Sequence, residues 1–134
     1  MMCLRKINVV IKRNKENNWR NIEHLLRGNQ LEGKTIGIIG FGRIGGNVLK
    51  YAKSFGAKIL IYDPFIKGNY KNTLSKIKNN SDIILSSMSY SKKNWNFFNW
   101  NFFKTLKQKP IFINTSRGEV VNEVDLIKAL KFNK

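Results

Sequence analysis

An arginine at the end of an apolar run is the residue of this sequence best suited to chemistry. Arg117 follows the run Pro110–Asn114 (PIFIN) and is separated from it only by Thr115 and Ser116. A planar guanidinium at the end of a strand can bind a carboxylate through two parallel hydrogen bonds and can stabilise negative charge on a reacting oxygen. The same position could equally form a salt bridge or cap the strand, so the residue alone leaves both readings open.

A glycine turn earlier in the chain could bind phosphate groups. Gly40, Gly42 and Gly45 form a G-x-G-x-x-G pattern (GFGRIG). The pattern alone is weak, but here an apolar run, 35–39, precedes it and a helical pattern follows, which is the context of a dinucleotide-binding turn. We expect Gly40 to permit the turn, Gly42 to let a pyrophosphate approach the backbone, and Gly45 to let the helix pack against the strand.

Two further features complete a predicted dinucleotide site. The backbone amides of Arg43 and Ile44 open the helix and would point at the phosphates. Asp63 ends the apolar run 58–62, about 20 residues beyond the glycines, where an acid accepts hydrogen bonds from ribose hydroxyls. A carboxylate there repels a 2′-phosphate, which favours NAD over NADP. Alternatively, Asp63 and Pro64 only initiate a turn.

Apolar runs alternate with helical patterns along most of the chain. Strands are expected at 35–39, 58–62, 82–85 and from 110 on, and helices at 44–55 (with Ile44, Val48, Ala52 and Phe55 on one face), around 74–77, at 95–106 and after Asn122, with a leading helical segment within 1–30. This alternation predicts an α/β fold with a doubly wound parallel sheet and helices on both faces. We expect the sheet to be incomplete, because no further strand follows the last helix.

Length, composition and charge narrow the function classes. The chain has 134 residues, which suits one domain, and no apolar run approaches the roughly 18 residues of a membrane span. The single cysteine, Cys3, excludes an internal disulfide and a cysteine-based metal cluster and suggests a reducing, cytoplasmic location. The net charge of +17 could suggest nucleic-acid binding, but the lysines are spread among Asn and Ile. We favour a compositional bias and predict no nucleic-acid, membrane or metal partner.

Taken together, these residues resemble the NAD-binding domain of the D-isomer-specific 2-hydroxyacid dehydrogenases, a family that includes phosphoglycerate dehydrogenase. The stretches that carry the resemblance are LEGKTIGIIGFGRIG (31–45), SFGAK (54–58), YDP (62–64), SD (81–82), INTSRG (113–118) and VNE (121–123). The resemblance covers nearly the whole chain in one order. It implies a dinucleotide-binding domain over 1–134, with a leading helical segment at 1–30 and a Rossmann core at 31–134.

The resemblance also implies which residues contact NAD. The set is Gly40, Gly42, Arg43, Ile44, Gly45, Asp63, Met88, Thr115, Ser116 and Arg117. Thr115 and Ser116 would line the nicotinamide side. Met88 lies where this chain departs from the family, which often has His-x-Pro in place of Ser87-Met88-Ser89; a serine lacks the fixed φ of proline.

Arg117 matches the catalytic arginine of the family. In the full-length enzyme it would bind the carboxylate and the keto oxygen of a 2-keto acid, while hydride passes between NAD and the C2 carbon of the 2-hydroxy acid. A fixed cation at that oxygen lowers the barrier, because negative charge grows there as hydride adds.

Other parts of the family pattern are missing from this chain. The acid/base histidine, the glutamate that orients it and the flanking substrate domain have no counterpart here, and the only histidine, His24, is expected to be a surface or packing residue. We therefore expect a fragment that binds NAD weakly and has little activity alone. The family also suggests a homodimer. The alternative is a non-catalytic NAD-binding module with a regulatory or interaction role.

An aromatic block has two readings. It consists of Trp95, Phe97, Phe98, Trp100, Phe102 and Phe103. Interleaved with asparagines in a basic chain, these rings could stack on nucleic-acid bases. We favour the other reading, in which they fill the core or an interface.

Overall fold

The computed structural model describes residues 3–14, 28–66, 68 and 72–132. Its strands are β1 (Thr35–Ile39), β2 (Lys58–Tyr62), β3 (Ile83–Ser86) and β4 (Ile111–Asn114). Its helices are α1 (Ile7–Asn14), α3 (Arg43–Ser54), α4 (Leu74–Asn80), α5 (Trp100–Phe103) and α6 (Glu123–Lys131), with 3-10 turns η1 (Lys92–Asn94) and η2 (Gly118–Val120).

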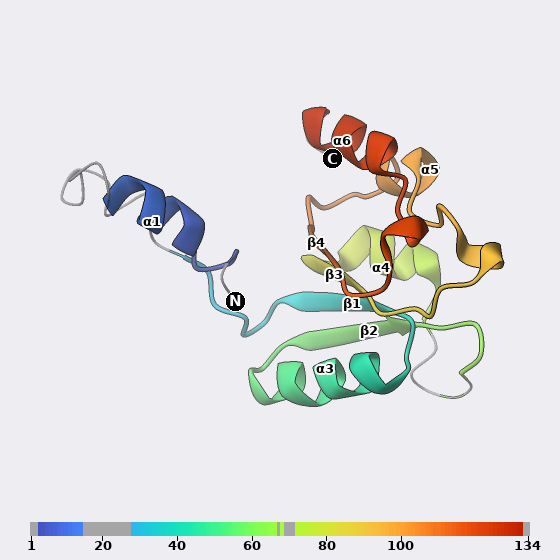
Figure 1. The fold of residues 1–134 in the computed structure, drawn as a ribbon. Helices are drawn as coiled ribbons and strands as arrows, with labels where there is room; N and C mark the ends of the chain where they lie inside the picture. Colours follow the sequence, from blue (N-terminus) through green and yellow to red (C-terminus); the bar gives the residue numbers. More distant parts are fainter. Residues whose placement is uncertain (1–2, 15–27, 67, 69–71, 133–134) are drawn as a thin grey trace.

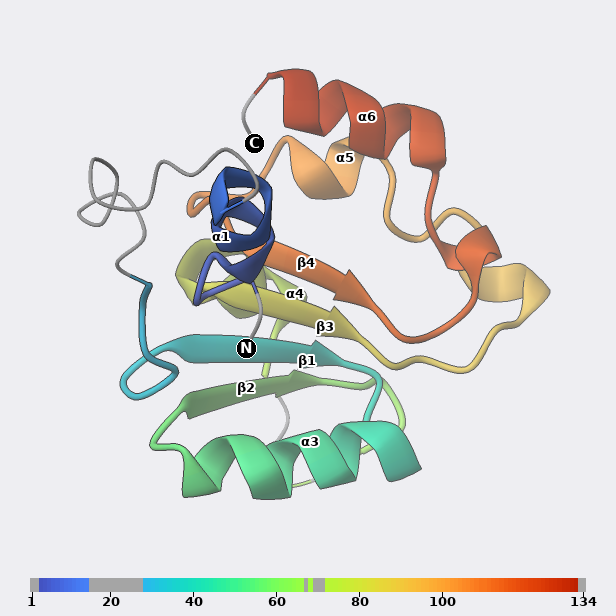
Figure 2. The same cartoon turned by 60° about the vertical axis from the view of Figure 1, so that its left-hand side comes forward.

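The strands form one parallel sheet in the order β2-β1-β3-β4. The chain therefore leaves β1 for β2 on one side and returns to β3 on the other side of β1. Helix α3 lies along one face of the sheet and α4 along the opposite face (Figures 1 and 2). The predicted α/β fold with a doubly wound parallel sheet is confirmed.

Alternate residues of the central strand supply two separate cores. Ile36 and Ile38 face α3 and pack with Ala52 and with Ile61 of β2. Ile39 points to the other face, where Ile77 of α4 and Ile84 of β3 are fully buried beside aromatic rings. Both faces of the two inner strands, β1 and β3, are covered, as the continuous apolar runs of a parallel sheet require.

The aromatic block forms the centre of the second core. The ring of Phe98 is 0% exposed, and the rings of Phe97, Phe102 and Phe112 meet it edge-on at centroid distances of 5.0, 4.9 and 5.0 Å. Such edge-to-face pairs contribute beyond their buried area. The core reading of the block is therefore confirmed for Phe98, Phe102 and Phe103, whereas Trp95 is exposed.

The predicted helix at 95–106 is present only over 100–103, as α5, because asparagine side chains interrupt the chain before it. Asn94 accepts a hydrogen bond from the Ser91 amide and closes η1, and Asn96 adopts a positive φ of 51°. Asn99 then caps α5 by accepting from the Phe102 amide. Asparagine competes with helical hydrogen bonds in this way and tolerates the left-handed region.

Three smaller expectations need correction. On α3 the buried face carries Gly45 and Ala52, whereas Ile44 and Phe55 are 49% and 57% exposed, because Gly45 sets the side that meets the sheet. Strand β3 begins and ends one residue later than the predicted 82–85, and the carboxylate of Asp82, just before it, accepts from the Thr35 amide. The leading helix is seen as α1 only, and His24 lies outside the described residues.

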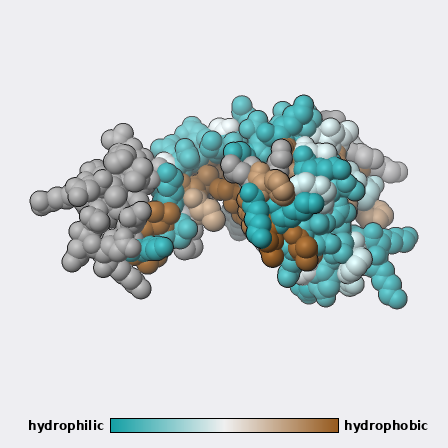
Figure 3. Space-filling view, turned by 90° about the horizontal axis from the view of Figure 1, so that it is seen from above, coloured by the Kyte–Doolittle hydropathy of each residue, from teal (hydrophilic) through white to brown (hydrophobic). Residues whose placement is uncertain are grey.

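Helix α6 begins as predicted, since the Asn122 side chain accepts from the Asp125 amide. It also leaves a stripe of apolar side chains exposed, formed by Val124, Ile127 and Leu130. More apolar side chains reach the surface on α1, and brown atoms show between the α1 region and the rest of the molecule (Figure 3). Among the described helices, none combines the length and the apolar character that crossing a bilayer requires.

Candidate functional site

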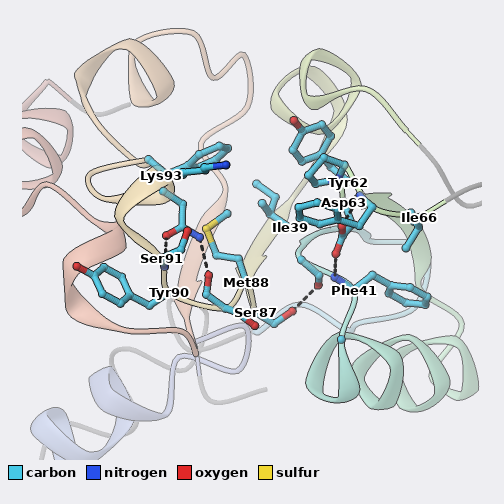
Figure 4. Close-up of a pocket in the computed structure, with 17 residues that line it drawn as sticks. Ile39, Phe41, Tyr62, Asp63, Ile66, Ser87, Met88, Tyr90, Ser91 and Lys93 are labelled. Carbon is cyan, nitrogen blue, oxygen red and sulfur yellow. Dashed lines mark hydrogen bonds between the residues drawn. The ribbon is translucent and has the colours of Figure 1, made fainter.

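A pocket lies at the carboxyl ends of β1, β2 and β3. Because β1 connects to β2 on one side and is flanked by β3 on the other, the sheet has its topological switch point there, which is where open α/β sheets bind ligands. The pocket has a volume of about 660 Å³ (Figure 4). It is lined by residues 39–42 at the end of β1, 62–66 at the end of β2, and 87–91, 93, 94 and 97 after β3.

The three glycines of the turn differ in what surrounds them. Gly40 has a φ of +90°, and a Cβ atom on it would lie 2.5 Å from the backbone N and Cα of Met88. A Cβ atom on Gly45 would lie 2.6 Å from the Gly40 carbonyl oxygen. Nothing lies within 4 Å of a Cβ placed on Gly42. The turn and packing roles predicted for Gly40 and Gly45 are thus confirmed, and Gly42 leaves bare backbone open to a ligand.

The first turn of α3 offers unpaired amides beside this opening. Gly42 is the N-cap residue and supplies no side-chain hydrogen bond, and the first turn holds no acidic residue. The first amides of a helix have no partner inside the helix, and the helix dipole favours an anion near them. Arg43 and Ile44, whose amides were predicted to meet phosphate, are exposed here.

Asp63 lies across the turn and already holds two amides. One carboxylate oxygen accepts from the Phe41 amide at 2.7 Å, and the other accepts from the Phe65 amide at 2.8 Å. The second bond spans two residues and is an Asx-turn, so the turn-initiating role of Asp63 is confirmed. Each carboxylate oxygen has a further lone pair, so the side chain can also accept from ribose hydroxyls.

The residues after β4 form a separate group at the same sheet edge. Thr115 donates its hydroxyl to the Ser86 carbonyl oxygen at 2.7 Å, and the Ser116 hydroxyl is 2.8 Å from that of Ser86. Arg117 is exposed, and within the described ranges no acidic side chain pairs with its guanidinium. None of Thr115, Ser116 and Arg117 lines the pocket, whereas Gly40, Gly42, Asp63 and Met88 do.

Several pocket residues were not predicted as cofactor contacts from the sequence. They are Ile39, Phe41, Tyr62, Pro64, Phe65, Ile66, Ser87, Ser89, Tyr90, Ser91, Lys93, Asn94 and Phe97. Most are apolar or aromatic, and Phe41, Phe65 and Ser87 lie within three residues of a strand end, which is the one sequence signal that could have indicated them. Over the described part of the chain, no group of three or more His, Cys, Asp or Glu side chains could hold a metal ion.

Comparison with known proteins places the chain in a family. Residues 1–134 match the family described as "D-isomer specific 2-hydroxyacid dehydrogenase, NAD binding domain". The putative 2-hydroxyacid dehydrogenase YoaD of Bacillus subtilis is 37% identical over 112 residues, which are 81% of this chain and 33% of that protein. A glyoxylate reductase of Thermococcus litoralis is 40% identical over 109 residues, which are 75% of this chain and 33% of that protein.

A solved structure agrees with these relatives. The D-lactate dehydrogenase of Aquifex aeolicus, complexed with NAD and lactic acid, superposes with a TM-score of 0.90 at 27% identity, over 99% of this chain and 41% of that one. The chain thus spans about a third of the length of the curated relatives described above. It belongs to the D-isomer-specific 2-hydroxyacid dehydrogenase family and corresponds to the NAD-binding domain of that family.

Proposed function

We propose that this chain is the cofactor-binding part of an enzyme that transfers hydride between NAD and the C2 carbon of a 2-hydroxy or 2-keto acid. The observation that carries the proposal is the pocket at the switch point, which both the open backbone of Gly42, the N-cap residue of α3, and Asp63 line. The dehydrogenases among the relatives support an enzyme over a non-catalytic binding module.

In this proposal the adenosine half of NAD occupies the pocket. The apolar and aromatic walls of the pocket suit the flat adenine ring, and Asp63 accepts hydrogen bonds from the hydroxyls of the adenosine ribose. Met88 lines the same pocket as Asp63, which supports a contact with the adenosine half. The diphosphate lies over Gly42 against the amides of Arg43 and Ile44, whose helix terminus favours negative charge.

The nicotinamide half then extends toward the end of β4. The backbone and hydroxyl of Thr115 and the hydroxyl of Ser116 are fixed by Ser86, which supports a firm wall on that side. Arg117 has its guanidinium exposed beyond this wall, where it can bind a substrate carboxylate and stabilise charge on the keto oxygen. The proposal assigns the acid/base role to no residue of this chain.

The cofactor half of the proposal is tested by titrating the chain with NAD and NADP in a calorimeter. We expect NAD to bind more tightly than NADP, because the Asp63 carboxylate repels a 2′-phosphate. Asp63→Ala should weaken NAD binding about 10- to 100-fold, as expected for lost hydrogen bonds to a charged group. It should also reduce the difference in affinity between NAD and NADP. Equal NAD heats for the wild type and Asp63→Ala would remove Asp63 from the ribose.

The substrate half is tested with oxamate, an unreactive analogue of a 2-keto acid, added to the chain in the presence of saturating NADH. We expect weak binding that Arg117→Ala lowers about 10-fold or more, since a charge-assisted bidentate pair is lost. Arg117→Lys is the matched control, because it keeps the charge but loses the planar fork and should recover only part of the affinity. Oxamate binding that is indifferent to both changes would contradict the role of Arg117.

The location, oligomeric state and partners of the enzyme can be inferred as well. We infer a cytoplasmic protein that works as a homodimer and has no nucleic-acid partner. The lone Cys3 supports the reducing compartment, and the exposed apolar side chains of α1 support contact with a second subunit.

A further inference from the structure

The peptide group between Gly40 and Phe41 is held at both of its polar ends by side chains from other strands. Its carbonyl oxygen, that of Gly40, accepts a hydrogen bond of 2.6 Å from the Ser87 hydroxyl. Its N–H, that of Phe41, donates to the Asp63 carboxylate at 2.7 Å. Both bonds are visible in the close-up of the pocket (Figure 4). Ser87 follows β3 and Asp63 follows β2, so the turn after the central strand is held from both neighbouring strands.

Ser87 also stands where three elements converge. Its amide donates to the Ile39 carbonyl oxygen at 2.8 Å, which continues the pairing of β3 with β1. Its hydroxyl oxygen lies 3.0 Å from the position that a Cβ atom would take on Gly45, in the first turn of α3. Ser87 therefore contacts the end of β1 through its amide, and the glycine turn and the start of α3 through its side chain.

The hydroxyl of Ser87 is not available as a donor to the cofactor while this bond exists. A serine hydroxyl has one hydrogen to donate, and here it goes to the Gly40 carbonyl oxygen. The oxygens of a diphosphate at neutral pH are acceptors only. A direct hydrogen bond from Ser87 to the diphosphate would therefore require release of Gly40, so its influence on binding runs through the turn.

We propose that Ser87 is a positioning residue for the diphosphate of the cofactor. By fixing the Gly40–Phe41 peptide group against rotation, together with Asp63, it sets the path of the backbone into Gly42 and the first amides of α3. This inference rests on the proposed NAD site and deepens it. It separates two parts of that site, because adenosine uses the pocket walls, whereas ADP and NAD also use the turn.

The test compares adenosine, ADP and NAD as ligands of the 134-residue chain by calorimetry. Ser87→Ala should weaken ADP and NAD about 3- to 12-fold, the range expected for one hydrogen bond, and should change adenosine binding less than about 2-fold. Ser54→Ala is the matched control, since it removes a hydroxyl that donates to a backbone carbonyl, that of Lys50, outside the site. It should alter none of the three affinities.

A second readout needs no ligand. Hydrogen exchange of the Phe41 amide, followed by NMR, should accelerate in Ser87→Ala, because the peptide group is released at one end, and should be unchanged in Ser54→Ala. If Ser87→Ala does not fold, Ser87→Cys provides a weaker donor of similar size, for which a smaller effect in the same direction is expected.

The outcomes distinguish this inference from the proposed function. If the wild type binds neither ADP nor NAD, the proposed function fails, and the Phe41 exchange rate still decides whether Ser87 holds the turn. Equal losses for adenosine and ADP, no loss for either, or unchanged Phe41 exchange would each overturn the positioning role.

Discussion

Gly42→Val is expected to weaken NAD binding by at least about 100-fold and to leave the fold in place. The valine side chain would enter the space that the diphosphate needs, at the cost of two or more charge-assisted hydrogen bonds of about 1.5–3 kcal/mol each. The fold should tolerate it, because a Cβ atom at this position meets nothing within 4 Å and the backbone φ is −85°.

Gly40→Ala, two residues earlier, is the matched counterpart with the opposite outcome. Its φ of +90° strains any side chain, and the new methyl would lie 2.5 Å from the Met88 backbone. Strain and overpacking together should lower the free energy of unfolding by about 2–6 kcal/mol.

The pair is measured by thermal unfolding and by NAD titration of each variant. Gly42→Val should unfold near the wild-type temperature and bind NAD much more weakly, whereas Gly40→Ala should unfold well below the wild-type temperature. A Gly42→Val variant that still binds NAD at wild-type strength would place the diphosphate elsewhere, and with it the whole cofactor.

Phe98→Ala is expected to cause a large loss of stability, because it removes a ring from the centre of the core. The ring is fully buried and meets three other rings, so its removal leaves a cavity that costs about 3–5 kcal/mol. That is a large share of the 5–15 kcal/mol that holds a typical domain together. The unfolding temperature should fall by about 10–20 °C.

Phe65→Ala is the control for that loss, because it removes another phenylalanine ring, from a residue that is 92% exposed. Its unfolding temperature should stay within a few degrees of the wild type. Unfolding is followed by circular dichroism during heating. An unfolding temperature of Phe98→Ala as close to the wild type as that of Phe65→Ala would show that the aromatic cluster does not stabilise the fold.

The strands were predictable because each is an apolar run bounded by residues that stop it. Thr35–Ile39 ends at a glycine and Lys58–Tyr62 ends at Asp63, and both match the structure at each end. The segment 95–106 was not predictable from its apolar spacing, because local hydrogen bonds of Asn94 and Asn99 outweigh helix propensity there.

The candidate site was predictable only in part, for a related reason. The glycine turn and Asp63 carry their role in local spacing, so the sequence indicates them directly. The pocket wall depends on strand order, which brings the residues after β2 and β3 to either side of β1. Spacing along the chain does not reveal which strands are neighbours, and so the sequence did not indicate that Ser87 would hydrogen-bond to Gly40.

The apolar stripe on α6 has a practical consequence for every titration proposed above. Val124, Ile127 and Leu130 invite contact between molecules, while a charge of +17 keeps the molecules apart through mutual repulsion. Added salt shortens the range of that repulsion to about 8 Å at 0.15 M, but it does not weaken hydrophobic contact through the apolar stripe. We therefore expect this polypeptide to stay dispersed best in dilute, low-salt buffer.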